Sequence, residues 1–105
     1  MNVAIYHRVS TLDQRPELAR EELRAAARAD VVVLDVEETG SGANNDRPGL
    51  QQILGAARRR TIDRVLVWKL DRFGRSARDV LANVEQLNAA GVTFTAVSQG
   101  LDLRP

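Results

Sequence analysis

The strongest constraint on the fold of this chain is a regular alternation of strand-like and helix-like segments along its 105 residues. Four short runs rich in Val, Ile and Leu predict strands, at residues 3–9, 30–37, 64–70 and 92–97. The second and third runs are almost continuously apolar, which is typical of strands that are covered on both faces. Such strands favour a buried, mostly parallel sheet.

The segments between the first three strands carry helix signals. Pro16 suits the first turn of a helix over residues 16–29, with Leu18 and Leu23 on one side. The next helix has an apolar stripe at positions i, i+3, i+4 and i+7, formed by Leu50, Ile53, Leu54 and Ala57.

A third helix is predicted to begin after Ser76 as its N-cap, with Asp79 completing a variant of the capping box, and to end at Gly91. We expect its apolar side to contain Ala77, Val80, Leu81 and Val84. Strands and helices then alternate, and right-handed crossovers give an α/β fold. The prediction is a three-layer sandwich around a mostly parallel sheet of four or five strands, with the flavodoxin-like order 2-1-3-4. Residues 1–105 form a single domain.

The composition excludes several classes of site. The chain has no Cys, so it has no disulfide framework, thiolate nucleophile or Cys-based zinc site. His7 is the only His, which excludes a Ser-His-Asp triad and a His-rich metal site. There is no apolar run of membrane-spanning length and no signal-peptide pattern, so we expect a cytoplasmic protein without membrane contact.

The formal net charge of +1 conceals an uneven distribution. Residues 30–46 contain five acids and no base, whereas residues 58–78 contain eight bases and two acids. All the basic residues except Lys69 are Arg, whose planar guanidinium suits phosphate. A GC-rich coding bias is the alternative explanation, and it accounts well for the predicted solvated run Arg58 to Arg60.

Sites in open parallel sheets form at the carboxyl ends of the strands, where the strand order reverses. Arg8 and Ser10 lie at the carboxyl end of the first predicted strand, on the same face as Tyr6. The loop after the third strand and the start of the second helix add Asp71, Arg72, Arg75 and Arg47. One hydroxyl, four guanidiniums and one carboxylate suit attack by Ser10 on a phosphate without a metal ion.

Each of these residues also has a structural interpretation. Ser10 is of a type common in turns, and Asp71 and Arg72 can form an ordinary surface ion pair. His7 and Trp68 are expected to be packing residues. The Gly40-Ser41-Gly42 stretch lacks the Gly-Lys-Ser/Thr of a phosphate loop, so no nucleotide is expected. The functional interpretation rests on three loops carrying Arg to one sheet edge.

Three motifs cover these loops in order. They are Tyr6-His7-Arg8-Val9-Ser10-Thr11 with Gln14, Ser41-Gly42 followed by Asp46-Arg47-Pro48-Gly49-Leu50, and Lys69-Leu70-Asp71-Arg72-Phe73-Gly74-Arg75. With these motifs the sequence resembles the catalytic domain of serine site-specific recombinases, the resolvase/invertase family, over essentially the whole chain.

The resemblance implies a cofactor-free enzyme of DNA strand exchange. Ser10 would attack a DNA phosphodiester, form a 5′-phosphoserine link and release a 3′-hydroxyl. The scissile phosphate would be held by Arg8, Arg72 and Arg75. Asp71 would transfer a proton or position an Arg. Supporting contacts would come from Arg47, Gln14, Lys69 and Glu38. The implied partners are a double-stranded recombination site and, in the full-length protein, further copies forming a homodimer and tetramer.

The sequence departs from the family pattern at two places. Relatives usually carry a second Gln five residues after the position of Gln14, where this chain has Ala19. The family also continues into a long oligomerisation helix and a DNA-binding region, so we expect residues 1–105 to be the catalytic domain of a longer recombinase, with little strand exchange alone. Both departures motivate the alternative of an idle domain used for assembly or regulation. A phosphoacceptor signalling domain is less favoured, because Arg-Val-Ser occupies the place of its paired acids.

Overall fold

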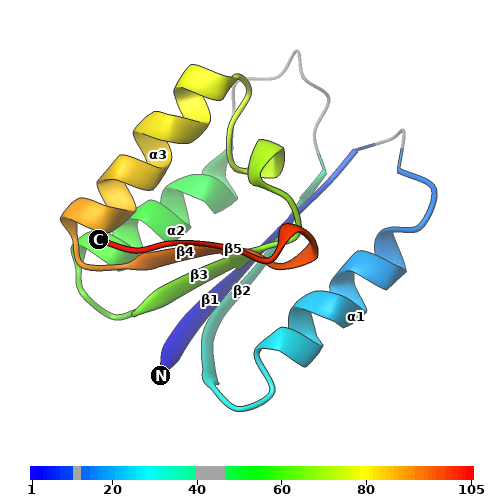
Figure 1. Ribbon diagram of the computed structural model, residues 1–105, viewed down its shortest axis with the longest axis horizontal. Helices are drawn as coiled ribbons and strands as arrows, with labels where there is room; N and C mark the ends of the chain where they lie inside the picture. Colours follow the sequence, from blue (N-terminus) through cyan, green and yellow to red (C-terminus); the bar gives the residue numbers. More distant parts are fainter. Residues whose placement is uncertain (11–12, 40–46) are drawn as a thin grey trace.

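Five strands form one sheet in the order β2-β1-β3-β4-β5 (Figure 1). The computed structural model describes residues 1–10, 13–39 and 47–105. The strands are β1 (Asn2–Val9), β2 (Val31–Thr39), β3 (Arg64–Val67), β4 (Thr93–Ala96) and β5 (Leu101–Leu103). The α-helices are α1 (Pro16–Ala26), α2 (Pro48–Arg58) and α3 (Ala77–Ala89), and two short 3-10 helices are η1 (Leu70–Phe73) and η2 (Val97–Gln99).

The predicted α/β sandwich and the strand order 2-1-3-4 are confirmed. The first four strands pair in parallel, and β5 is added antiparallel to β4 at the edge of the sheet. The β1–β3 pairing covers Val3–Ile5, whereas the β1–β2 pairing continues to Val9. The carboxyl end of β1 therefore diverges from β3, and this opens the sheet edge at the point where the strand order reverses.

The two faces of β1 contribute to separate cores. Ala4 and Tyr6 pack into the larger core, with buried residues of α2 and α3. Val3 and Ile5 pack into the smaller core beside Leu23 of α1. Figure 1 shows the same layers, with α2 and α3 on one side of the sheet and α1 on the other. Because side chains alternate along a strand, β1 delivers Arg8 to the α2/α3 side and His7 to the α1 side.

The prediction that the second strand is covered on both faces is wrong. Val31, Val32 and Val33 are exposed, and Val36 is the buried hydrophobic residue of β2. The cause is topological, because β2 is an edge strand with β1 as its neighbour. The third strand also ends earlier than expected, at Val67, and the chain then turns into η1.

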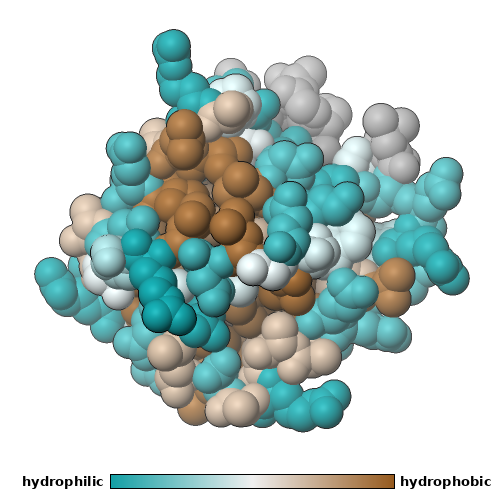
Figure 2. Space-filling view, viewed as in Figure 1, coloured by the Kyte–Doolittle hydropathy of each residue, from teal (hydrophilic) through white to brown (hydrophobic). Residues whose placement is uncertain are grey.

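Two predicted core leucines are exposed. Leu18 lies off the buried stripe of α1, which follows i, i+4 spacing through Ala19, Leu23 and Ala27. Leu81 lies beside the buried stripe of α3 and is 59% exposed. Figure 2 shows apolar side chains gathered over α3 and η1. Leu81 lines a groove of about 450 Å³ whose wall also includes Leu70 and Val80. In the described ranges, no helix is long and apolar enough to cross a membrane.

Candidate active site at the carboxyl edge of the sheet

Ser10 stands directly after β1, in a turn closed by Asp13. The Ser10 N–H donates to Asp13 Oδ2 at 2.8 Å, and the Asp13 N–H donates to the Ser10 carbonyl oxygen at 3.0 Å. The Ser10 side chain is half-buried. The turn interpretation of Ser10 agrees with these main-chain bonds, and Ser10 stands at the open edge of the sheet.

Arg72 approaches this turn from η1, which follows β3. Its Nη2 donates to Asp13 Oδ1 at 2.6 Å, and both side chains are 21% exposed. The predicted Asp71–Arg72 pair is much looser, with 3.9 Å between Oδ1 and Nε, and the Asp71 side chain is 80% exposed. Asp13, rather than Asp71, is thus the main carboxylate partner of Arg72.

Asp13 was not among the predicted site residues. Burial by itself would raise the pKa of its carboxyl, but the Ser10 N–H and the Arg72 guanidinium together lower that pKa. The group is therefore ionised at neutral pH. The sequence signal for it is the spacing Ser-x-x-Asp, in which an acid reaches back to a backbone N–H three residues earlier.

Arg8 lies on the α2/α3 side and is held by the η1–α3 connection. Its Nη1 donates to the Gly74 carbonyl oxygen at 3.2 Å. A Cβ at Gly74 would lie 2.7 Å from the Val80 backbone nitrogen, so a side chain at this position would push η1 away from α3. Asn83 fastens the same connection, because its buried Nδ2 donates to the Phe73 carbonyl oxygen at 2.8 Å.

Arg47 is the N-cap residue of α2 and is buried. Neither Nη1 nor Nη2 has a hydrogen-bond partner within residues 1–10, 13–39 and 47–105. Burial lowers the pKa of this guanidinium, and the charges of Arg8 and Arg75 lower it further, whereas Tyr6 and Asp79 act in the opposite direction. Arg8 and Arg75 thus lie close enough to Arg47 for their positive charges to repel its charge. An anionic ligand would relieve this repulsion.

Glu38 fixes the start of α2 from the end of β2. Its carboxylate accepts the Tyr6 hydroxyl at 2.6 Å and the N–H groups of Gly49 and Leu50 at 2.7 and 3.3 Å. Burial and this carboxylate raise the pKa of Tyr6, so the phenol stays protonated. An acid at a helix N-terminus also complements the helix dipole. Glu38 therefore places the helix that begins beside Arg47.

A cationic pocket of about 340 Å³ lies between the ends of β1 and β3 and the start of α1. Gln14, Lys69 and Ala19 contribute to its wall. Its charged lining consists of Arg8, Arg15, Lys69, Arg72 and Asp13, besides His7. Lys69 lies over the Trp68 ring with Nζ 4.7 Å from the centroid. The excess of cations over carboxylates suits a phosphate-bearing ligand.

The remaining predicted residues occupy varied positions. Arg75 is exposed just before α3, where its N–H donates to Asp79 Oδ2 at 2.9 Å. Trp68 is half-buried and donates from Nε1 to Glu22 Oε2 at 2.7 Å, so its assignment to the core holds in part. The motif residues Thr11, Ser41, Gly42 and Asp46, like the Gly40–Gly42 stretch, lie outside the described residues.

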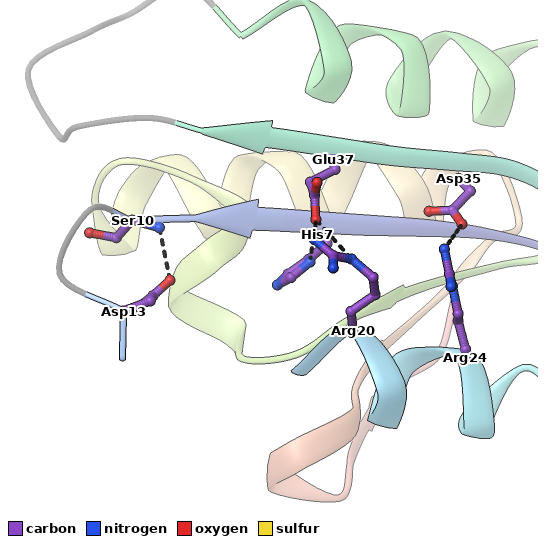
Figure 3. A network of polar contacts seen from close by, with 7 residues as sticks. All are labelled: His7, Ser10, Asp13, Arg20, Arg24, Asp35 and Glu37. Atoms are coloured by element: carbon purple, nitrogen blue, oxygen red, sulfur yellow. Dashed lines mark hydrogen bonds and ion pairs between the residues drawn. The ribbon is translucent and has the colours of Figure 1, made fainter. Parts of the chain in front are cut away.

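A separate polar network covers the α1 side of β1 (Figure 3). His7 is buried, as expected for a packing residue, and its Nδ1 lies 3.1 Å from Glu37 Oε1. Arg20 of α1 donates from Nε to the same oxygen at 3.0 Å. Burial lowers the pKa of His7, although Glu37 opposes that shift. No group of three or more His, Cys, Asp or Glu side chains in the described part of the chain is arranged to hold a metal ion.

Comparison with known proteins gives consistent matches over nearly the whole chain. Residues 3–105 match the family described as "Resolvase, N terminal domain". The DNA-invertase of Enterobacteria phage P7 is 38% identical over 97 residues, covering 92% of this chain and 49% of the relative. The serine recombinase gin of Escherichia phage Mu is 37% identical, covering 92% of this chain and 47% of the relative. The chain thus spans about half the length of the curated relatives it matches.

Solved structures give the same result. The N-terminal catalytic domain of TP901-1 integrase is 34% identical with a TM-score of 0.79, covering 97% of this chain and 81% of that one. A resolvase family site-specific recombinase from Streptococcus pneumoniae is 28% identical with a TM-score of 0.81, covering 97% of this chain and 75% of that one.

Proposed function

The chain belongs to the resolvase N-terminal domain family, and we propose that it is the catalytic domain of a serine site-specific recombinase that cleaves and rejoins DNA strands. The observation that carries the proposal is the link from Ser10 through Asp13 to Arg72, beside a pocket whose wall also includes Arg8. Arg72 and Arg8 are oriented there by Asp13 and by the Gly74 carbonyl oxygen. Arg47 is buried nearby, with both Nη groups unsatisfied by the described residues.

In the proposed reaction, Ser10 Oγ attacks the phosphorus of a DNA phosphodiester. The Oγ–P bond forms, the bond from phosphorus to the 3′-oxygen breaks, and the product is a 5′-phosphoserine ester with a free 3′-hydroxyl. The serine proton leaves as the nucleophile attacks, and the 3′-oxygen gains a proton as it departs. Rejoining is the reverse attack by a 3′-hydroxyl on the ester. The ester conserves the phosphodiester bond, so no nucleotide has to supply energy.

The arginines would provide the electrostatic part of catalysis. Arg8, Arg72 and Arg75 would contact the phosphoryl oxygens, where negative charge increases in the transition state. The buried Arg47 would contribute a further positive charge from the start of α2. Asp71 is the proposed proton carrier, and its high exposure supports access to a DNA oxygen. Gln14 and Lys69 would bind the flanking backbone from the pocket wall, and Glu38 would support Arg47 through α2.

The proposed partner is a double-stranded recombination site, and the proposed active form is a homodimer that pairs into a tetramer in the full-length protein. Relatives named DNA-invertase and serine recombinase support DNA as the substrate. We propose the cytoplasm as the location, because the DNA substrate lies there in a bacterium. The cationic pocket supports a phosphate backbone as the ligand.

Covalent capture of DNA tests this function. Residues 1–105 replace the matching segment of the phage P7 DNA-invertase, and the chimera is incubated with a DNA substrate which that invertase cleaves. We expect a DNA–protein adduct that survives denaturation, and we expect Ser10→Ala to abolish it. Ser98→Ala is the matched control, because the Ser98 hydroxyl donates to the Trp68 carbonyl oxygen at 2.7 Å and Ser98 is not part of the pocket wall. Equal adduct from Ser10→Ala and the unmodified chimera contradicts the proposal.

The idle-domain alternative has one observation in its favour. Ala19 is buried in the pocket wall, at the position where the family pattern has Gln. If the chimera folds, binds the DNA and forms no adduct, the domain is idle. The Ala19→Gln variant of the chimera then tests whether the missing amide at this position is the reason that no adduct forms.

A further inference from the structure

We propose that Asp13 is a positioning residue that sets the place of Ser10 relative to Arg72, an inference that rests on the proposed function. Its two carboxylate oxygens have different partners. Oδ2 accepts the Ser10 N–H at 2.8 Å, and Oδ1 accepts Arg72 Nη2 at 2.6 Å. One rigid group therefore joins the segment that follows β1 to the 3-10 helix that follows β3.

The backbone makes this connection stiffer. The Asp13 N–H donates to the Ser10 carbonyl oxygen at 3.0 Å, so Ser10 and Asp13 are bonded in both directions. On the other side, the Arg72 N–H donates to the Lys69 carbonyl oxygen at 3.0 Å within η1. Because the Asp13 carboxylate bridges two anchored segments, it limits changes in the distance between the Ser10 hydroxyl and the Arg72 guanidinium.

This role differs from that of a phosphate ligand. Asp13 is negatively charged and lies in the wall of the cationic pocket, so it repels a phosphate rather than attracts it. Removing its charge should leave DNA binding unchanged or make it tighter. If Asp13 orients the reacting groups, the same change should slow the chemical step, because small displacements of reacting groups are costly. The rate of the chemical step should therefore fall while the affinity for DNA stays the same or rises.

Two substitutions separate the contacts. Asp13→Asn retains a carbonyl oxygen that can accept the Ser10 N–H but loses the charge that faces Arg72, whereas Asp13→Ala loses both contacts. In the invertase chimera under single-turnover conditions with saturating DNA, we expect adduct formation to slow about tenfold for Asp13→Asn and about a hundredfold for Asp13→Ala. The DNA concentration that gives half-maximal adduct should be unchanged or lower in both.

Asp35→Asn is the matched control, because Asp35 is a partly exposed acid on β2 whose ion pair with Arg24 spans 3.9 Å. It should retain the rate of the unmodified chimera. If Asp13→Ala fails to fold, the folded Asp13→Asn protein decides the question through the same split between rate and half-saturation.

The outcomes distinguish a failure of the proposed function from a failure of the positioning role of Asp13. If the unmodified chimera forms no adduct, the proposed function fails and this inference fails with it. If the unmodified chimera reacts and Asp13→Ala reacts within about twofold of it, the positioning role alone is wrong. Weaker DNA binding at an unchanged rate also overturns it, because that result would make Asp13 a support for ligand binding.

Discussion

Gly49→Ala is the substitution whose consequence follows most directly from the structure. A Cβ at Gly49 would lie 2.5 Å from Val36 Cγ1 and 2.7 Å from Glu38 Cδ, both well inside van der Waals contact. The new methyl group must therefore displace the Glu38 carboxylate or the end of β2. Glu38 holds the first N–H groups of α2 and the Tyr6 hydroxyl, so one methyl group disturbs three hydrogen bonds.

The magnitude follows from three destabilising terms and one stabilising term. Overpacking a buried contact costs about 1–3 kcal/mol, and loss of the carboxylate cap costs about 1 kcal/mol. A buried hydroxyl left without its acceptor costs about 1–3 kcal/mol when the partner is not replaced. The higher helix propensity of Ala returns at most about 1 kcal/mol. We expect the free energy of unfolding to fall by about 3 kcal/mol, which is a large part of the stability of a small domain.

Urea denaturation of the 105-residue chain measures this loss. With a typical urea dependence for a small domain, about 3 kcal/mol lowers the midpoint by about 1.5–2 M. Gly55→Ala in the same helix is the matched control. Its Cβ would meet Arg59 Nη1 at 3.1 Å, the mobile end of a long side chain, so it should be neutral or stabilise the domain by up to about 1 kcal/mol. Equal midpoints for the two variants would refute the role of Glu38 as a rigid neighbour.

Two further substitutions test the electrostatics of the domain. Burial lowers the pKa of His7 from its usual 6.5, so the unfolded chain takes up this proton more readily, and unfolding becomes easier as the pH falls below 6.5. Unfolding at a series of pH values should show a shallower decline for His7→Gln than for wild type as the pH falls below 6.5, and parallel curves would contradict this assignment. Arg47→Met should abolish the DNA adduct and leave stability unchanged or about 1 kcal/mol higher, because a buried guanidinium whose two Nη groups have no hydrogen-bond partner among the described residues is costly. A loss of several kcal/mol in urea would show instead that Arg47 supports the fold.

The topology could be predicted from the sequence because it depends on periodicity. The alternation of apolar runs and helix signals fixed the order of elements, and right-handed crossovers left few ways to arrange four parallel strands. The same reasoning placed Arg8 and Tyr6 on one face of β1, which is confirmed by the contact of Arg8 with Gly74 and by the packing of Tyr6 against Phe73. These are local properties of the chain.

The errors arose where an outcome depends on distant contacts. Val31 to Val33 form as apolar a run as a central strand, and their exposure follows from the position of β2 at the edge. Composition does not show which carboxylate will pair with Arg72, because Asp71 is adjacent in sequence whereas Asp13 is 59 residues away. The pairing depends on the tertiary structure, in which η1 lies against β1 and Arg72 reaches Asp13.

The acids around the site bond largely to main-chain N–H groups. Glu38 uses its oxygens on two N–H groups of α2, and Asp79 accepts the N–H of Arg75. Asp13 accepts the Ser10 N–H with one carboxylate oxygen and Arg72 Nη2 with the other. Glu38 and Asp79 thus hold the ends of a strand and a helix in place through main-chain donors, whereas Asp13 also pairs directly with the Arg72 guanidinium. Exchanging one of them for an amide should therefore change the geometry of the site more than its affinity for phosphate.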